Sequence, residues 1–200
     1  MKIDGTDIEI KWIGHAGFMI KNSLIIYIDP YNIKDGLPKA DIILITHSHY
    51  DHCSVEDLNK IVQEKTRIIC TADCQSKITK FDVPVKIDLV EPNQELDLGT
   101  IRLITIPSYN IDKDFHPKES NWVGYLIKMN GVSIYHAGDT DMIPEMQKLT
   151  GHQGNFIALL PVGGRFTMTA EEAAEAAKII KPSTAIPMHF GSFVGSEEDA

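Results

Sequence analysis

The sequence predicts an α/β protein in which two sheets are sandwiched between helices. Strand-like apolar runs dominate the first two thirds of the chain, and helical patterns alternate with strands in the last third. No internal repeat, low-complexity tract or linker interrupts this pattern. The chain has 200 residues, which is enough for one sizeable core, so we expect a single domain over residues 1–200.

Strands open the chain. Short apolar runs rich in Ile predict strands at residues 8–13, 18–20, 24–28 and 42–45. The last of these, in the stretch IILIT, is apolar on both faces, as in a buried strand. An amphipathic helix is then expected over residues 54–64, because Ser54 can cap it and the apolar residues recur at helical spacing.

The remaining elements follow the same rules. Strands are predicted at residues 67–70, 85–89, 101–106, 124–129, 132–135, 156–160 and 184–187, and helices at residues 72–80, around 143–149 and from Thr169 onward. Asn130-Gly131 is a two-residue hairpin signal. Thr169 and Glu172 have the spacing of a capping box.

Charge and composition exclude several classes of protein. The 19 basic and 28 acidic residues give a net charge of −9, so no general positive field attracts nucleic acid. The apolar runs are too short to span a membrane, and the N-terminus lacks a signal-peptide pattern. The three cysteines include no C-x-x-C pair and fit a reducing compartment. We expect a cytoplasmic protein that acts on a small molecule, without nucleic acid or membrane insertion.

A dense group of potential metal ligands follows the predicted strand at residues 42–45. It comprises His47, His49, Asp51 and His52. Imidazole nitrogen and carboxylate oxygen suit zinc, iron and manganese, and the i, i+2 spacing lets two histidines converge from an extended segment. A loop of solvated histidines is the alternative interpretation.

Two later segments repeat the order of a short apolar strand followed by a potential ligand. Asp139 follows the strand at residues 132–135, and His189 follows the strand at residues 184–187. A single carboxylate can hold two cations about 3.5 to 4 Å apart, so Asp139 is a candidate bridging ligand. An aspartate that only forms a turn, and a core histidine, are the respective alternatives.

The motifs HSHYDH, AGDTD and PMHFG, in this order, resemble those of the metallo-β-lactamase superfamily. More narrowly, the chain resembles the small metal-dependent hydrolases of the ascorbate-6-phosphate lactonase-like and N-acyl-phosphatidylethanolamine phospholipase D-like branches. WIGHAGFMI, YIDPY, WVGYLI and PVGGRFTM extend the similarity over residues 8–193. The resemblance implies a four-layer αβ/βα sandwich of two mixed sheets flanked by helices.

The resemblance also implies a dinuclear ligand set. It assigns His47 and His49 to one metal, Asp51, His52 and His189 to a second, and Asp139 to a bridge between them. Zinc is the expected metal, with manganese, iron or nickel as alternatives.

A third histidine of the first metal is missing from its usual place in this pattern. The loop after the strand at residues 101–106 offers Asn110 where the family has histidine, and His116 six residues later. We expect His116 to be the ligand, with Asn110 as the alternative or as a substrate contact. Arg165 is a further substrate candidate. His15 is expected at the rim of the site, as an acid or substrate contact or as a structural histidine.

These residues predict a hydrolase. A hydroxide bridging two cations would attack an ester, lactone or phosphodiester bond, while Asp51 orients or deprotonates the water and His15 protonates the leaving oxygen. The main alternative is a sensor or other non-catalytic protein that keeps the metal. A nuclease is disfavoured by the charge of −9. A diiron redox protein is disfavoured because His49 stands where that branch has glutamate.

Overall fold

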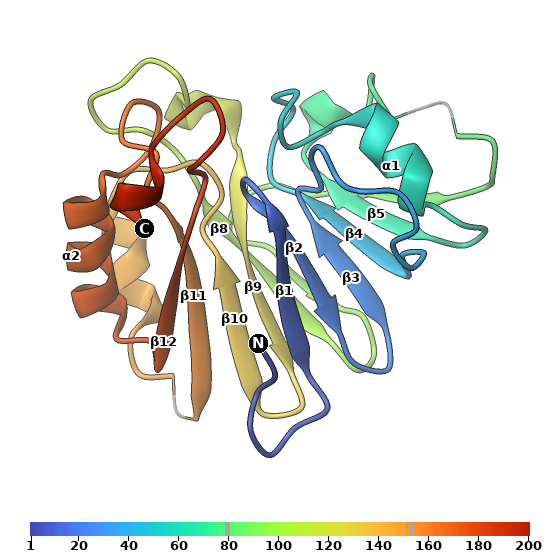
Figure 1. Cartoon of the computed structure of the whole chain (residues 1–200), viewed down its shortest axis with the longest axis horizontal. Coiled ribbons are helices and arrows are strands. Elements are labelled where there is room, and N and C mark those ends of the chain that lie inside the picture. The colour runs from blue at the N-terminus through green and yellow to red at the C-terminus, as the bar shows by residue number, and fades with distance from the viewer. Residues whose placement is uncertain (79–80, 153) are drawn as a thin grey trace. The chain divides into compact units, whose positions relative to one another are not determined.

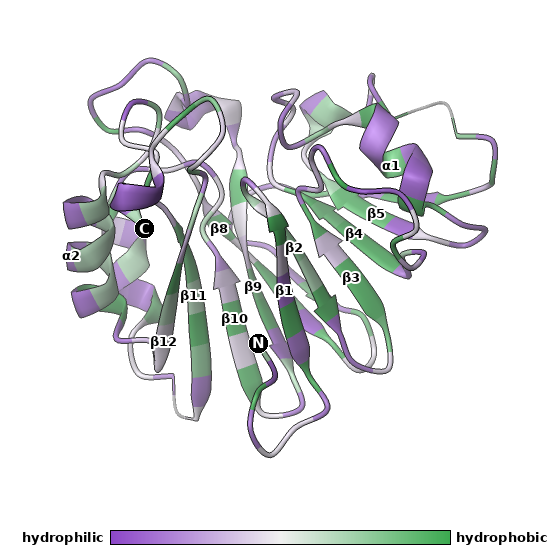
Figure 2. Cartoon of the chain, in the orientation of Figure 1, coloured by the Kyte–Doolittle hydropathy of each residue, from purple (hydrophilic) through white to green (hydrophobic). Residues whose placement is uncertain are grey.

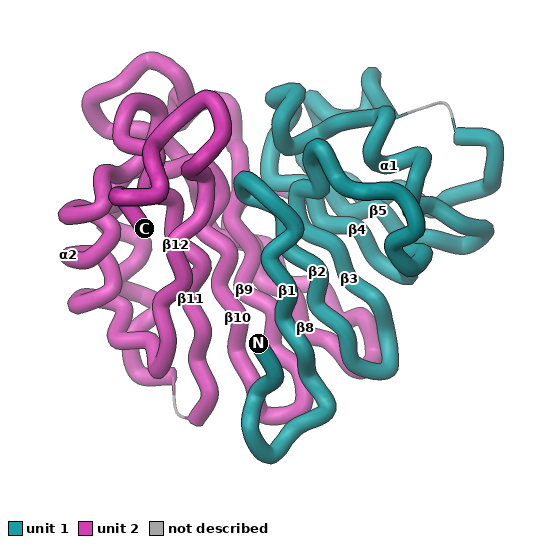
Figure 3. Tube along the Cα trace, viewed as in Figure 1, with its two compact units in different colours: residues 1–90 teal, residues 91–200 magenta. Residues whose placement is uncertain are grey.

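The chain forms two compact units in this computed structural model, which describes residues 1–78, 81–152 and 154–200. Unit 1 comprises residues 1–90 and unit 2 comprises residues 91–200 (Figure 3). Each unit contains one six-stranded mixed sheet. The predicted α/β class with two mixed sheets flanked by helices is therefore confirmed, whereas the single domain over residues 1–200 stays a prediction.

The sheet of unit 1 follows the order of the chain (Figure 1). Its strands are β1 (Glu9–Gly14), β2 (Gly17–Lys21), β3 (Ile25–Ile28), β4 (Ile42–Ile45), β5 (Arg67–Cys70) and β6 (Lys86–Leu89). Strand β2 is antiparallel to both β1 and β3, and β3 to β6 are parallel to one another. All four residues of β4 are buried, as the apolar run predicts.

Helix α1 (Val55–Ile61) packs on one face of this sheet. Leu58 and Ile61 of the helix lie in one apolar cluster with Ile43 and Ile45 of β4. Ser54 caps the helix by accepting a hydrogen bond from the backbone N–H of Asp57, as the sequence predicts. Figure 2 shows the outcome: the strands are largely apolar, while α1 presents a mainly hydrophilic surface.

The sheet of unit 2 has the order β12-β11-β10-β9-β8-β7. Its strands are β7 (Glu95–Asp97), β8 (Arg102–Pro107), β9 (Val123–Met129), β10 (Val132–His136), β11 (Asn155–Pro161) and β12 (Thr184–Met188). Strands β7 to β10 are antiparallel, and β10, β11 and β12 are parallel. The predicted Asn130-Gly131 hairpin joins β9 to β10.

Helix α2 (Ala170–Ile180) packs beside β11 and beside the short 3₁₀ helix η3 (Pro144–Leu149). The capping box of α2 is present: Thr169 accepts from the N–H of Glu172, whose side chain accepts from the N–H of Thr169. The described residues also form the single-turn 3₁₀ helices η1 (Ala72–Cys74), η2 (Lys118–Ser120) and η4 (Glu197–Asp199). No helix in the described residues is long and apolar enough to cross a membrane.

Two elements differ from the prediction. The helix expected at residues 72–80 is only the turn η1; residues 79 and 80 of that prediction lie outside the described residues. The N–H groups of Lys77 and Ile78 both bond to the carbonyl of Cys74, so the segment coils as consecutive turns. Strand β7 was missed, because its residues Glu-Leu-Asp carry little strand propensity.

Candidate metal centre

The functional side chains of unit 1 follow strands whose carboxyl ends lie at one edge of its sheet. Strands β1, β3 and β4 run in the same direction, since β2 is antiparallel to β1 and β3, and β4 is parallel to β3. His15 follows β1, Asp29 follows β3, and Thr46 and His47 follow β4. The strand order alone therefore gathers residues far apart in sequence.

His47 and His49 lie side by side on the loop after β4. The Nε2 of His47 is 3.0 Å from the Nδ1 of His49, so the two ring nitrogens can share one proton or one cation. The Nδ1 of His47 lies 2.9 Å from the hydroxyl of Thr46, which fixes the ring orientation. His47 is buried.

Asp29 holds the loop after β4 in place through hydrogen bonds. One carboxylate oxygen of Asp29 accepts from the backbone N–H of Thr46 at 2.8 Å. The other lies 2.6 Å from the hydroxyl of Thr46 and 2.8 Å from the Nδ1 of His52. All three residues are fully buried. The Nδ1 contact leaves the Nε2 of His52 as the atom available to a ligand. Sequence reasoning missed this role, although Asp29 lies in the YIDPY motif directly after an apolar strand.

A second group in unit 1 joins His15, Asp51 and His52. Their ligand atoms all lie within 4.8 Å of one another. The Oδ2 of Asp51 is 2.9 Å from the Nε2 of His15 and 3.5 Å from the Nε2 of His52. His15 lies in the tight turn between β1 and β2. This turn requires glycine at residue 17, since a Cβ there would lie 2.9 Å from the carbonyl oxygen of Gly14. His15, which the sequence places at the rim of the site, thus lies beside Asp51, and its role stays a prediction.

In unit 2, Asp139 is the centre of the corresponding group. Strands β8, β10, β11 and β12 all end at the same edge of the sheet, because β9 is antiparallel to β8 and β10. The Oδ2 of Asp139 is 3.2 Å from the Nε2 of His116 and 3.0 Å from the Nε2 of His189. One carboxylate oxygen therefore contacts two imidazoles from different segments, and all three residues are buried.

Asn110 holds His116 in this position. The Oδ1 of Asn110 accepts from the backbone N–H of His116 at 3.0 Å and contacts its Nδ1 at 2.9 Å. The Nδ2 of Asn110 donates to the carbonyl of Phe166 at 3.0 Å. Of the two residues, His116 presents a ring nitrogen to Asp139, while the amide of Asn110 is occupied with orienting it.

The loop that carries His116 is fastened by two acidic residues. Asp141 accepts from the N–H of Ile111 at 2.8 Å and from the ammonium of Lys113 at 2.5 Å. Burial lowers the pKa of Lys113, but the ion pair with Asp141 outweighs it and the pKa is raised. Glu145 accepts from the hydroxyl of Tyr109 at 2.9 Å. Burial raises the pKa of Glu145, but its hydrogen bonds outweigh this and the net shift is downward.

His189 follows β12 in a crowded position. Its backbone is left-handed, with φ of 60°. A Cβ on Gly163 would lie 2.7 Å from the carbonyl oxygen of His189 and 2.9 Å from its Nδ1, so only glycine leaves room for this ring.

Other predicted residues have clear positions. Arg165 is exposed, and its guanidinium carbon lies 5.1 Å from the ring centre of Phe166. His136 is fully buried, and its Nδ1 accepts from the N–H of Gly138 at 3.2 Å, which shapes the turn before Asp139. The three cysteines are buried in the core of unit 1, as expected, and free of disulfides.

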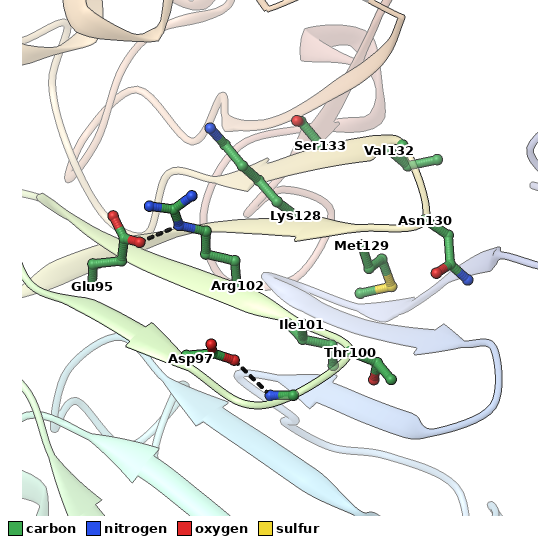
Figure 4. Close-up of a pocket in the computed structure, with 12 residues that line it drawn as sticks. Glu95, Asp97, Thr100, Ile101, Arg102, Lys128, Met129, Asn130, Val132 and Ser133 are labelled. Atoms are coloured by element: carbon green, nitrogen blue, oxygen red, sulfur yellow. Dashed lines mark hydrogen bonds and ion pairs between the residues drawn. The ribbon is translucent and has the colours of Figure 1, made fainter.

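A large surface pocket in unit 2 lies away from these residues. Its volume is about 750 Å³, and it lies around the β7–β8 and β9–β10 turns, at the opposite edge of the sheet from Asp139 (Figure 4). Glu95 and Arg102, which both line it, form an ion pair. The described residues that line it include none of the predicted site residues. The chemistry of the donors, and not the size of a pocket, therefore locates the candidate site.

Comparison with known proteins agrees with this geometry. Residues 9–189 match the family model of the beta-lactamase superfamily domain. A metal-dependent hydrolase of Thermococcus kodakarensis is 32% identical over 96% of this chain and 88% of its own length. The chain belongs to the metallo-β-lactamase superfamily.

Solved structures extend the likeness to the fold of this superfamily. A Parabacteroides distasonis protein aligns with a TM-score of 0.82 and 32% identity, over 92% of this chain and 83% of its own. A metallo hydrolase of the archaeon Ignicoccus hospitalis aligns with a TM-score of 0.74 and 25% identity, over 93% and 84%.

The donors of this metallo-β-lactamase superfamily member fit divalent transition metals. They are imidazole nitrogens and carboxylate oxygens, held within buried loops and oriented by further hydrogen bonds. In unit 2 the same Asp139 oxygen faces two ring nitrogens at hydrogen-bond distance.

Proposed function

We propose that this chain is a metal-dependent hydrolase that uses a dinuclear, zinc-type centre to cleave an ester, lactone or phosphodiester bond. The observation that carries the proposal is the convergence of His116 and His189 on one oxygen of Asp139. The metal-dependent hydrolase of Thermococcus kodakarensis, a relative along nearly the whole chain, supports the same class of reaction.

The ligand roles follow from chemistry and family pattern. By the family pattern, Asp139 would be shared between two metals, His47, His49 and His116 would hold the first, and Asp51, His52 and His189 would hold the second. The 3.0 Å contact between His47 and His49 supports their sharing of one cation. The common position of Asp51 and His52 in a second group supports their sharing of the other.

When bound, such a centre supplies a Lewis acid for the substrate oxygen and lowers the pKa of a water to about 7. The protein supplies proton transfer and orientation. Asp51 accepts the proton of the attacking water at Oδ2, and His15, whose Nε2 lies 2.9 Å away, passes a proton to the leaving oxygen. No serine or cysteine nucleophile is required.

Asn110 acts as a positioning residue and not as a ligand. Its Oδ1 already accepts from His116 at two atoms. An amide oxygen is also a poorer zinc ligand than an imidazole nitrogen.

The cellular setting follows from composition. A net charge of −9 disfavours nucleic acid as a substrate, and three buried free thiols fit a reducing compartment. We therefore place the enzyme in the cytoplasm, acting on a small molecule.

Hydrolysis of a panel of chromogenic esters, lactones and phosphodiesters tests the function. The protein is stripped with chelator and reloaded separately with Zn²⁺, Mn²⁺, Fe²⁺ and Ni²⁺. We expect turnover that disappears on chelation, returns with metal, and falls at least about 100-fold in Asp51→Ala. Metal binding without turnover on any substrate would contradict the hydrolase and favour the sensor.

A further inference from the structure

Apolar side chains are exposed on the loop that carries His116. Ile111 is 62% exposed and Phe115 is 44% exposed, although both are large hydrophobic residues. The ring of Phe115 meets that of Phe166 edge to face, with centroids 4.5 Å apart. This pair is a preferred aromatic geometry and forms a defined apolar surface rather than a disordered one.

The partner Phe166 belongs to the loop at residues 162–169, between β11 and α2. The carbonyl of Phe166 accepts from Asn110 at 3.0 Å and lies 3.1 Å from the Nδ1 of His116. The same loop contains Gly163, which packs directly against His189. The loop that carries Phe166 therefore contacts both His116 and His189, the two histidines that face Asp139.

Arg165 adds a positive charge to this surface. Its side chain is exposed, and the guanidinium lies over the ring of Phe166. Within the part of the chain that the structure describes, no carboxylate forms an ion pair with it. Stacking on an aromatic face orients the planar guanidinium while its N–H groups stay available to an oxyanion.

We propose that Ile111, Phe115, Arg165 and Phe166 form a specificity surface that selects an amphiphilic anionic substrate. The apolar alkyl or aryl part of the substrate packs on Ile111 and the aromatic pair. Arg165 binds a carboxylate or phosphate on the same molecule, a few bonds from the scissile group. The inference rests on the proposed hydrolase and deepens it, because the surface is built on residues that hold His116.

A pair of esters with one leaving group tests the charge selection. We compare 4-nitrophenyl butyrate, which is neutral, with the mono-4-nitrophenyl ester of glutaric acid, which carries a carboxylate. Arg165→Gln should lower kcat/KM for the anionic ester by about 10- to 100-fold and leave the neutral ester within about twofold. Phe115→Ala should lower both, since it removes packing. Metal content should stay unchanged in both variants.

Lys178→Gln is the matched control, because Lys178 lies on the exposed side of α2 and pairs with Glu175. It should leave both esters unaffected. Equal effects of Arg165→Gln on the two esters would overturn the inference while leaving the hydrolase intact.

Binding decides the inference independently of turnover. Calorimetry with 4-phenylbutyrate and its neutral amide should show tighter binding of the carboxylate to the wild-type protein, and Arg165→Gln should remove this preference by about 10-fold or more. If no substrate is hydrolysed but the wild-type protein still prefers the carboxylate probe, the proposed function is contradicted and the specificity surface is not. Equal affinities of both probes for the wild-type protein would overturn the specificity surface.

Discussion

Three residues of the candidate site have a left-handed backbone directly after a strand. They are His15, Asp29 and His189, with φ of 51°, 43° and 60°. This conformation costs non-glycine residues about 1 kcal/mol or more, so the surrounding structure must hold it in place. Part of the backbone strain of the chain therefore lies in the candidate site.

Asp29 is predicted to control metal affinity through His52. Asp29→Asn keeps the side-chain size but removes the charge that fixes the Nδ1 of His52. We expect metal affinity to fall about 10- to 100-fold, as for other residues that orient a ligand. Competition with a chromophoric chelator measures this. Asp88→Asn, which disrupts a partly exposed pair with Arg67, should have no effect; equal losses in both variants would argue against the role.

Asn110 is predicted to act through His116. Asn110→Ala removes the amide oxygen that accepts two hydrogen bonds from His116 and orients its ring. The substitution should also weaken metal binding about 10- to 100-fold. Asn110→Asp keeps an acceptor at the same place and should restore most of the affinity. Asn59→Ala on the exposed face of α1 is the control. If Asn110→Asp binds metal as weakly as Asn110→Ala, the loss of affinity does not come from a changed orientation of His116.

At the scale of elements, helix α1 is tied to a neighbouring loop through Asp57. Its carboxylate accepts from Ser54, from Lys60 and from the N–H groups of Asn32 and Ile33, at 2.7 to 3.1 Å. Burial raises the pKa of Asp57, but these hydrogen bonds outweigh it and lower the pKa below its ordinary value.

The pH dependence of stability follows from this shift. A carboxyl with a lowered folded pKa stabilises the protein above its unfolded pKa of about 3.9, and the contribution is lost as pH falls through the folded pKa. Asp57→Asn should therefore lower the free energy of unfolding by about 1 to 2 kcal/mol at pH 7, and by less below pH 4. Urea unfolding at several pH values measures the difference. Glu56→Gln, an exposed neighbour, is the control, and a pH-independent difference would contradict the mechanism.

The elements predicted best were those with strong local signals. The all-apolar β4, the Asn130-Gly131 hairpin and the capping box of α2 depend on neighbouring residues alone. Strand β7 depends on pairing with β8, which no local pattern reveals. The turn at Ala72–Cys74 resembles a helix start in sequence, but a single short turn has too few hydrogen bonds to propagate a helix without further packing.

At the scale of the whole molecule, contacts between residues far apart in sequence are again what local patterns do not reveal, and this applies to the candidate site. The donors His47, His49, Asp51, His52, Asp139 and His189 were predicted from motif and family resemblance. The structure added the roles of Asp29 and Asn110, because an orienting hydrogen bond between residues 23 apart leaves no trace in spacing. The position of His116 beside Asp139 likewise depends on how a long loop folds back, with Asn110 accepting at its base.

Metal binding should stabilise the whole protein. A ligand at 1,000 times its Kd adds about 4 kcal/mol to the free energy of unfolding, which corresponds to about 8 to 16 °C in Tm for a chain of this size. Chelation should lower the Tm by this order, and His116→Ala should show a smaller chelator effect than the wild type. Differential scanning calorimetry tests this; a Tm that ignores the chelator would contradict a structural contribution of the metal.

Elemental metal analysis of the purified protein tests the dinuclear centre most directly, with the wild type compared with His116→Ala and with His152→Ala as a control outside the site. We predict about two metals per chain in the wild type and in His152→Ala, and about one in His116→Ala. One metal or fewer in the wild type, unchanged by His116→Ala, would contradict the account.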